Sequence, residues 1–360
     1  LAEDSIRSVP KELKEGSFET AKADGAARYV QQLPAEALSA GDGKVKIEMK
    51  TPVGTVVISD NMFTKENTQN VENIGISIGY ADISGLEEKV RKEIGERPVI
   101  ELYATMDGKR VNWNNPKAPA EVSIDYAPTA DELKDPEHIV IWYIDGNGNI
   151  ISVPSGRYDP ETGKVTFTTT HFSMYAVAYV RKTFNDISKS YAGKQIEVLA
   201  SKGIINGTSD VTYSPKNNIT RADFTVLLIK TLGLEAEIDS GFSDIKSTDY
   251  FYYETGVAKK LGIAEGIGNN KFNPGGLISR QDMMVLTHRA LKAAGKISGA
   301  ADAPVPERFD DVSDISDYAV GSVSVLVNEE IIEGDGGRIN PRGNTTREEA
   351  AVLIYRIYYR

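Results

Sequence analysis

The chain has 360 residues, of which 40% are hydrophobic and 26% are charged, with a formal net charge of −11 and no cysteine. This length predicts two or three folding units, and the composition is that of a folded globular protein. The lack of cysteine excludes disulfides and thiolate metal sites. The three histidines show no metal-binding spacing, so we predict no metal and no cofactor. The negative charge argues against nucleic acid as a partner.

No apolar run approaches the roughly 18 residues of a membrane helix, so we predict no membrane insertion. The first ten residues, LAEDSIRSVP, lack the basic and apolar pattern of a signal peptide. A secreted parent would need such a peptide upstream, so we expect the sequence to be a mature chain or a fragment.

Residues 1–180 are predicted to form a β-sandwich-like domain, because short runs of alternating apolar residues are separated by turn residues. A hairpin is predicted where Asp145 to Gly148 separates two β-rich arms. Two segments are predicted to be helical, 87–94 and 129–135. The runs with strand periodicity are 45–49, 75–80, 99–104, 121–126 and 164–170.

From Phe184 the apolar spacing becomes helical and the sequence repeats itself three times. Each repeat opens with a Phe-x-Asp motif, continues to a first helix with a tyrosine near its start, and reaches a glycine after an apolar pair. Each then closes with a second helix that begins at an arginine. The opening aspartates are Asp186, Asp244 and Asp311, the tyrosines are Tyr191, Tyr250 and Tyr318, the glycines are Gly207, Gly266 and Gly334, and the arginines are Arg221, Arg280 and Arg347.

The register of these repeats is tight, since 37, 38 and 38 residues separate the opening Phe from the arginine. The composite pattern resembles that of S-layer homology repeats, which is F-x-D-V, GII-x-G, an aromatic, a proline and ITRAEF. Repeats are predicted at 181–238, 239–305 and 306–360, and the resemblance implies an all-α unit with pseudo-threefold symmetry. The segments 32–38, 52–58 and 170–180 resemble a β-rich module that precedes such repeats in bacterial surface proteins.

The second helices open with TRAD, SRQD and TREE, which is the spacing of a capping box. A hydroxyl at the first position and an acid three residues later are therefore explained by helix initiation. The arginine between them is at the first helical position, where the helix dipole disfavours a cation. Two interpretations remain open: contact with an anionic ligand at a helix N-terminus, or a salt bridge to the opening aspartate.

The resemblance implies that the chain anchors a surface protein to the bacterial cell wall, outside the cell. The expected partner is a secondary cell-wall polysaccharide with a pyruvylated sugar, bound in grooves between repeats. By resemblance the arginines contact the carboxylate, and backbone amides near the three glycines contact sugar hydroxyls and the carboxamide. The opening aspartates Asp186, Asp244 and Asp311 are also expected among the ligand-binding residues. The tyrosines are expected either to flank the sugar or to belong to the core. Another copy of the chain in a surface layer is the second expected partner.

The third repeat departs most from the pattern, with Glu330 in place of a glycine and a compressed loop before Arg347. We therefore expect Arg347 to contribute less to binding than Arg221 and Arg280. No catalytic motif is present in the sequence, and we predict that the chain is not an enzyme. The alternatives are a wall-attached glycoside hydrolase or protease fragment, in which residues 1–180 are catalytic or accessory, and an architectural protein that assembles into a surface layer.

Overall fold

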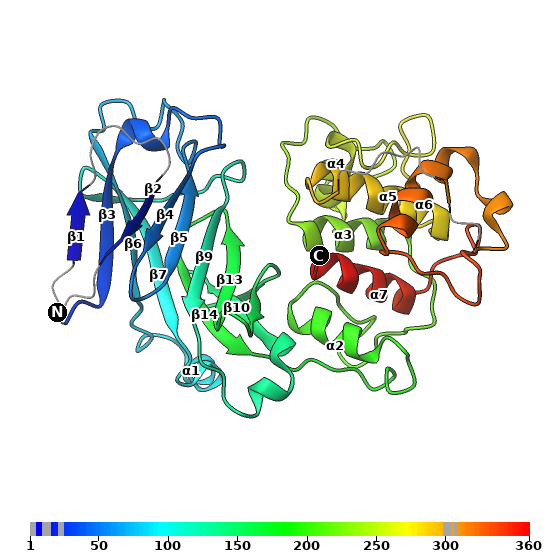
Figure 1. Ribbon diagram of the computed structural model, residues 1–360, viewed down its shortest axis with the longest axis horizontal. Coiled ribbons are helices and arrows are strands. Elements are labelled where there is room, and N and C mark those ends of the chain that lie inside the picture. Colours follow the sequence, from blue (N-terminus) through cyan, green and yellow to red (C-terminus); the bar gives the residue numbers. More distant parts are fainter. Residues whose placement is uncertain (1–4, 9–15, 21–24, 298–303, 306–307) are drawn as a thin grey trace. The chain divides into compact units, whose positions relative to one another are not determined.

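A computed structural model describes residues 5–8, 16–20, 25–297, 304–305 and 308–360 of the chain. It divides into two compact units, Leu1–Val180 and Arg181–Arg360 (Figure 1). Each unit is described by itself.

Where the structure describes the first unit, it forms two β-sheets, and nearly all of their neighbouring strands are antiparallel. The exceptions are β1 with β3 and β2 with β4, which are parallel pairs. One sheet has the order β1 (Ser5–Ser8), β3 (Arg28–Pro34), β6 (Asn73–Tyr80), β7 (Val99–Met106), β14 (Met174–Tyr179), β10 (Ile139–Ile144) and β11 (Ile150–Val153), with β8 (Lys109–Val111) beside β7. The other has the order β12 (Arg157–Asp159), β13 (Lys164–Thr169), β9 (Ala120–Asp125), β5 (Thr55–Ser59), β4 (Lys46–Lys50) and β2 (Gly16–Glu19).

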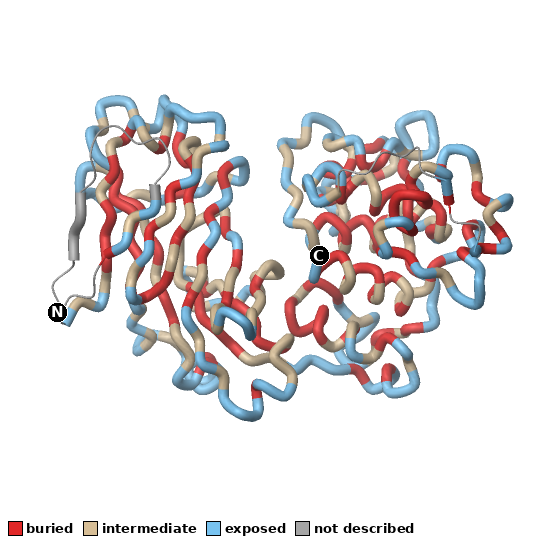
Figure 2. The backbone as a smooth tube through the Cα atoms, viewed as in Figure 1, coloured by how far each residue is buried: buried red, intermediate tan, exposed pale blue. Residues whose placement is uncertain are grey.

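Alternate residues of both sheets meet in one hydrophobic core, because successive side chains of a strand point to opposite faces. Ile76 and Leu102 from the first sheet share this core with Val122 and Phe167 from the second. Buried segments therefore run along the strands of both sheets (Figure 2). A second cluster forms where α1 (Glu88–Ile94) packs on strands β10 and β14.

The predicted strands, the hairpin and the helix at 87–94 are present. The Asp145 carboxylate accepts hydrogen bonds from the amides of Asn147 and Asn149 and closes the turn between β10 and β11. The helix predicted at 129–135 is wrong. Only a short 3₁₀ turn, η2 (Glu132–Lys134), forms there, and Pro136 begins another, η3 (Pro136–His138). Glu132 is drawn inward by Arg97 and Tyr126. A further 3₁₀ turn is η1 (Ala35–Leu38).

The described residues of the second unit form six α-helices, two from each repeat. The first helices are α2 (Gly193–Ser201), α4 (Tyr252–Lys260) and α6 (Asp317–Asn328), and the second helices are α3 (Arg221–Leu232), α5 (Arg280–Ala293) and α7 (Arg347–Tyr358). A 3₁₀ turn, η4 (Val312–Asp314), precedes α6. Among the described residues, no helix is long and apolar enough to cross a membrane.

The prediction that this unit is all-α is wrong. The extended segments before the second helices pair with one another through antiparallel bridges, Asn218 with Thr346, Thr220 with Leu277, and Ser279 with Asn344. Helical periodicity does not reveal these segments. Their backbone groups need hydrogen-bond partners once they are buried, and each finds them in a neighbouring repeat.

Three of these hydrogen bonds form a closed ring. The amide of Ile219 donates to the Thr345 carbonyl at 2.9 Å, that of Ile278 donates to the Ile219 carbonyl at 3.2 Å, and that of Thr345 donates to the Ile278 carbonyl at 3.0 Å. One residue from each repeat thus contributes one donor and one acceptor. The ring fixes the starts of α3, α5 and α7 relative to each other.

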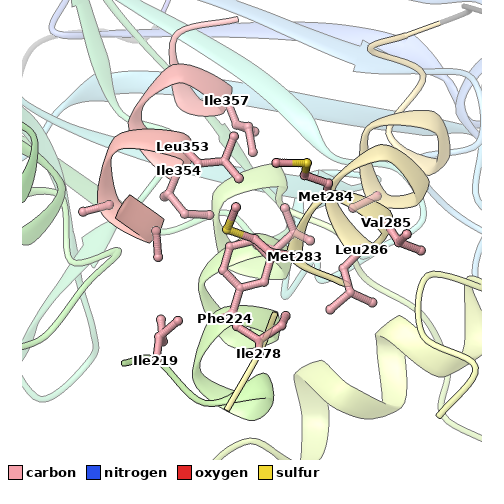
Figure 3. Close-up of a cluster of buried hydrophobic side chains, with 14 of the residues drawn as sticks. Ile219, Phe224, Ile278, Met283, Met284, Val285, Leu286, Leu353, Ile354 and Ile357 are labelled. Atoms are coloured by element: carbon pink, nitrogen blue, oxygen red, sulfur yellow. The ribbon is translucent and has the colours of Figure 1, made fainter. Parts of the chain in front are cut away.

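The helices also interlock between repeats. The first helix of each repeat packs against the second helix of the preceding one: α4 on α3, α6 on α5, and α2 on α7. The last contact joins the third repeat back to the first, so the repeat array is closed. Side chains of α3, α5 and α7 belong to one hydrophobic cluster, which includes Phe224, Met283 and Ile354 (Figure 3). The repeat boundaries at 238/239 and 305/306 stay predictions, and residue 306 lies outside the described residues.

Candidate functional site

The second helices begin as the sequence predicts. Arg221, Arg280 and Arg347 are the first helical residues, and the hydroxyl before each accepts a hydrogen bond from the amide three residues on. Only Thr346 and Glu349 complete a capping box, in which the Glu349 carboxylate also accepts from the Thr346 amide at 2.7 Å. In all three repeats the carboxylate accepts from the capping hydroxyl, but the acid of the other two repeats is an aspartate and does not complete the box.

Each arginine reaches across a repeat boundary. Arg221 Nε donates to the Phe272 carbonyl at 3.2 Å, and Arg280 Nε donates to the Ile339 carbonyl at 2.7 Å. Arg347 Nε donates to the Tyr213 carbonyl at 2.9 Å, which connects the third repeat to the first. These carbonyls occupy equivalent positions, two residues before the repeat's proline.

The second contact of each guanidinium differs among the repeats. Arg280 Nη1 lies 2.7 Å from Glu349 Oε1, whereas Arg221 Nη1 lies 3.9 Å from Asp282 Oδ2. Arg347 Nη2 donates to the Asn206 carbonyl at 2.8 Å, and its guanidinium lies over the Tyr213 ring. Within the described ranges, no carboxylate forms an ion pair with Arg347.

The opening aspartates do not pair with these arginines, so the salt-bridge interpretation is wrong. Asp186 accepts hydrogen bonds from the amides of Tyr213 and Ser214 at 2.9 and 2.7 Å. Asp244 and Asp311 make the equivalent pair of bonds in their own repeats. Burial acts to raise the pKa of each aspartate, but the amide hydrogen bonds outweigh it and lower the pKa. The aspartates therefore hold the loop that presents the carbonyl to the arginine.

The three glycines are packed tightly against the same loops. A Cβ atom on Gly207 would lie 2.3 Å from the Ser209 carbonyl oxygen, and one on Gly266 would lie 2.4 Å from that of Lys271. One on Gly334 would lie 2.6 Å from the Phe309 ring. None of the three glycine amides donates to any residue that the structure describes. These amides are therefore available to an external acceptor.

The three tyrosines are surface residues, with 62% of Tyr191, 69% of Tyr250 and 58% of Tyr318 exposed. The alternative that they are core residues is therefore wrong. The Tyr250 hydroxyl donates to Asp223 at 2.5 Å, and the Tyr318 hydroxyl donates to Asp282 at 2.9 Å. The Tyr191 hydroxyl has no hydrogen-bond partner among the described residues.

The charge of each arginine acts on a tyrosine of another repeat. Partial burial and the carboxylates of Glu349 and Glu348 together raise the pKa of Tyr191 to about 12, and the charge of Arg280 opposes them. Burial and the bond to Asp282 likewise raise the pKa of Tyr318 to about 12, against the influence of Arg221. Arg347 acts in the same sense on Tyr250.

Every arginine is accordingly surrounded by residues of all three repeats. We name the three sites after their arginines. The Arg221 site contains Asp282 and Tyr318, the Arg280 site contains Glu349 and Tyr191, and the Arg347 site contains Asn206, Asp223 and Tyr250.

Two residues that directly follow the arginines, Gln281 and Glu348, also help to build the sites, a role that the sequence did not predict. Glu348 is 3% exposed and accepts hydrogen bonds from Ser190 at 2.6 Å and Lys216 at 2.5 Å. Gln281 donates to the Tyr318 hydroxyl at 3.0 Å. These side chains hold the start of the next repeat's first helix, where the tyrosine is. Their only signal in the sequence was a polar residue where the first repeat has Ala222.

The fold and these sites define a closed three-repeat unit with an arginine at each repeat junction. Comparison with protein families agrees, since the S-layer homology domain matches residues 183–225, 241–284 and 308–351. The second unit of this chain therefore consists of three S-layer homology domains. The family match, together with relatives named as S-layer proteins, indicates a location at the cell surface or cell wall.

Three relatives show where this arrangement recurs. An amylopullulanase of Thermoanaerobacterium thermosulfurigenes is 31% identical over 319 residues, which cover 88% of this chain and 16% of that protein. An exoglucanase, XynX, of Acetivibrio thermocellus is 37% identical over 48% of this chain and 16% of its own length. The S-layer protein EA1 of Bacillus anthracis is 30% identical over 49% of this chain and 20% of its own length.

The chain thus spans a fifth or less of the length of these relatives. The amylopullulanase match must include part of the first unit, because the second unit is shorter than 319 residues. Two of these relatives are named as enzymes, which conflicts with our prediction that the chain is not an enzyme. The matched fraction of each is small, however, and the activity of a longer protein lies outside what the match describes.

Proposed function

We propose that the second unit attaches its protein to the bacterial wall by binding an acidic terminal sugar of a secondary cell-wall polysaccharide. The observation that carries this proposal is the repeated combination of an arginine at a repeat junction with an exposed tyrosine of another repeat. Arginine suits a carboxylate because its planar guanidinium offers several donors in a fixed fork. A pyruvyl group supplies such a carboxylate.

The other members of each site suit a sugar. An exposed tyrosine offers an apolar ring face together with a hydroxyl. The amides of Gly207, Gly266 and Gly334 are free donors for hydroxyl or acetamido oxygens. The opening aspartates already accept hydrogen bonds from loop amides, so we propose that they support the loops and do not contact the sugar. These aspartates are Asp186, Asp244 and Asp311.

Binding to wall fragments should weaken when pyruvyl groups are removed from the polymer. The measurement compares the full chain on intact fragments and on fragments from which only the pyruvate has been released. Equal binding to the two preparations would overturn the carboxylate assignment, although anchoring through the neutral parts of the sugar would survive.

For the first unit we propose a spacer or assembly role without catalysis. Its cluster of charged residues at β3, β7 and β8 is internally paired: Glu101 lies 2.7 Å from both Arg28 and Arg110, and both guanidiniums lie over the Tyr103 ring. Paired groups of this kind have no free carboxylate for acid catalysis. Hydrolysis of starch, glucan or xylan by the purified chain would contradict this assignment. Self-association in a surface layer remains part of the same proposal and is tested by sedimentation.

A further inference from the structure

We infer that the three arginine sites are not equivalent, because Glu349 acts as an internal competitor for Arg280 and leaves the Arg347 site as the main receptor for an anionic sugar. This inference rests on the proposed function. It concerns which site binds and which residue decides it.

The three sites differ because the acid of the third repeat is a glutamate, whose side chain is one methylene group longer than an aspartate. The acid of the second helix is an aspartate in the first two repeats, and each of these aspartates is occupied by a capping hydroxyl and by a tyrosine of another repeat. The longer Glu349 carboxylate divides its oxygens differently. Oε2 accepts from both the amide and the hydroxyl of Thr346. Oε1 reaches Arg280 at 2.7 Å, whereas the corresponding oxygen of each aspartate accepts from a tyrosine.

Arg280 is therefore already paired with a carboxylate at hydrogen-bond distance. An incoming carboxylate has to displace Glu349, or share the guanidinium with a second negative charge. Lys216 lies 5.5 Å from the centre of the Tyr191 ring and adds a cation nearby, but its ammonium is paired with Glu348. The local charges thus cancel in pairs, and the Arg280 site offers little net attraction.

Arg347 is arranged in the opposite way. Its Nε and Nη2 donate to two carbonyls and its guanidinium lies over the Tyr213 ring, so uncharged groups fix its position. Its charge helps to lower the pKa of Asp186, but both oxygens of that carboxylate already accept loop amides, and the described residues show no ion pair between the two. Asp223, the acid of this site, is engaged by Thr220 and Tyr250. A guanidinium has five N–H donors, so further donors remain for a ligand. The Arg221 site is intermediate, since Asp282 lies 3.9 Å away.

The test is calorimetric titration of the full chain with a monosaccharide of N-acetylmannosamine that carries a pyruvate ketal. Arg347→Ala should lower the affinity about tenfold or more, the scale of a hydrogen bond to a charged group. Arg280→Ala should change it less than about twofold. Glu349→Gln, which keeps a side chain suited to the capping box, should add binding at a second site. Glu349→Asp, which restores the acid of the other repeats, should act in the same direction.

Glu329→Gln is the matched control, because Glu329 is in the same repeat and pairs with Arg360 instead of a site arginine. It should leave the titration unchanged. The inference would be overturned if Arg280→Ala lowered the affinity more than Arg347→Ala does, or if neither Glu349 variant gained a second binding site. Binding by the wild-type chain would still support the proposed function in that case. Failure of the wild-type chain to bind both the saccharide and wall fragments would instead overturn the proposed function, and the inference with it.

Discussion

Thr345 offers a sharp test of how the three repeats are joined. It occupies the third place in the hydrogen-bonded ring, where the other repeats have Ile219 and Ile278. Its side chain is fully buried, and its hydroxyl has no hydrogen-bond partner in the part of the chain that the structure describes. A buried polar group without a partner costs about 1–3 kcal/mol. Thr345→Val replaces this hydroxyl with a methyl group of similar size and leaves the backbone ring intact.

We therefore expect Thr345→Val to stabilise the second unit by about 1–3 kcal/mol. At about 2–4 °C per kcal/mol for a unit of this size, the midpoint of thermal unfolding should rise by several degrees. Circular dichroism at 222 nm reports mainly on the helical unit. Both tryptophans, Trp113 and Trp142, are in the first unit, so their fluorescence supplies an internal control that should not change.

Thr345→Ser completes the comparison, since it keeps the hydroxyl and removes the methyl group. It should destabilise the helical transition by about 1 kcal/mol through lost apolar burial. If Thr345→Val left the helical transition unchanged or lowered it, the hydroxyl would have to be satisfied in solution, and our account of this junction would be refuted.

Three further predictions concern the loops and the closure of the unit. Asp244→Asn should lower the stability of the fold at neutral pH and make that stability less dependent on pH. A carboxylate whose pKa is lowered in the folded state stabilises the fold above its unfolded pKa, about 4, and this effect is lost as the pH falls through the folded pKa. Urea unfolding midpoints of the wild type and the variant at pH 7 and pH 3 would show the difference. Gly266→Ala should lower the free energy of unfolding by about 2 kcal/mol or more, because φ is +83° and a Cβ atom would lie 2.4 Å from a carbonyl oxygen. Gly268→Ala is the control, since φ is +99° there but the Cβ atom would meet open space. It should lower the free energy of unfolding less, as measured by urea denaturation. Residues 181–360 expressed alone should melt cooperatively. Removal of α7 from this fragment should abolish the transition, because α2 and α3 lose their packing partner. A cooperative transition in the shortened fragment would contradict the closed arrangement.

The repeat register could be predicted from sequence because each repeat carries its own motif residues at fixed spacing. Arg221, Arg280 and Arg347 were placed at helix starts for a local reason, the cap that precedes them, and local rules suffice there. The partners of these arginines could not be predicted. They come from other repeats, and spacing within one repeat contains no information about how repeats dock.

The expectation that Arg347 contributes less than Arg221 and Arg280 stays a prediction, and our inference from the structure opposes it. The expectation assumed that the irregular features of the third repeat surround the arginine of that repeat. The structure instead places Glu349 beside Arg280, and Arg347 beside Asn206 of the first repeat. The all-α prediction failed for a related reason, since bridges such as that between Thr220 and Leu277 form only after the repeats have closed.

The central claim, anchoring through a secondary wall polymer, is tested most directly by co-sedimentation of the full chain with purified wall sacculi. One sample retains the polymer, and the other has been stripped of it while the peptidoglycan stays intact. We predict that the chain sediments with the first sample and stays in solution with the second. Equal sedimentation with both samples would show that peptidoglycan itself is the receptor, and would contradict the account.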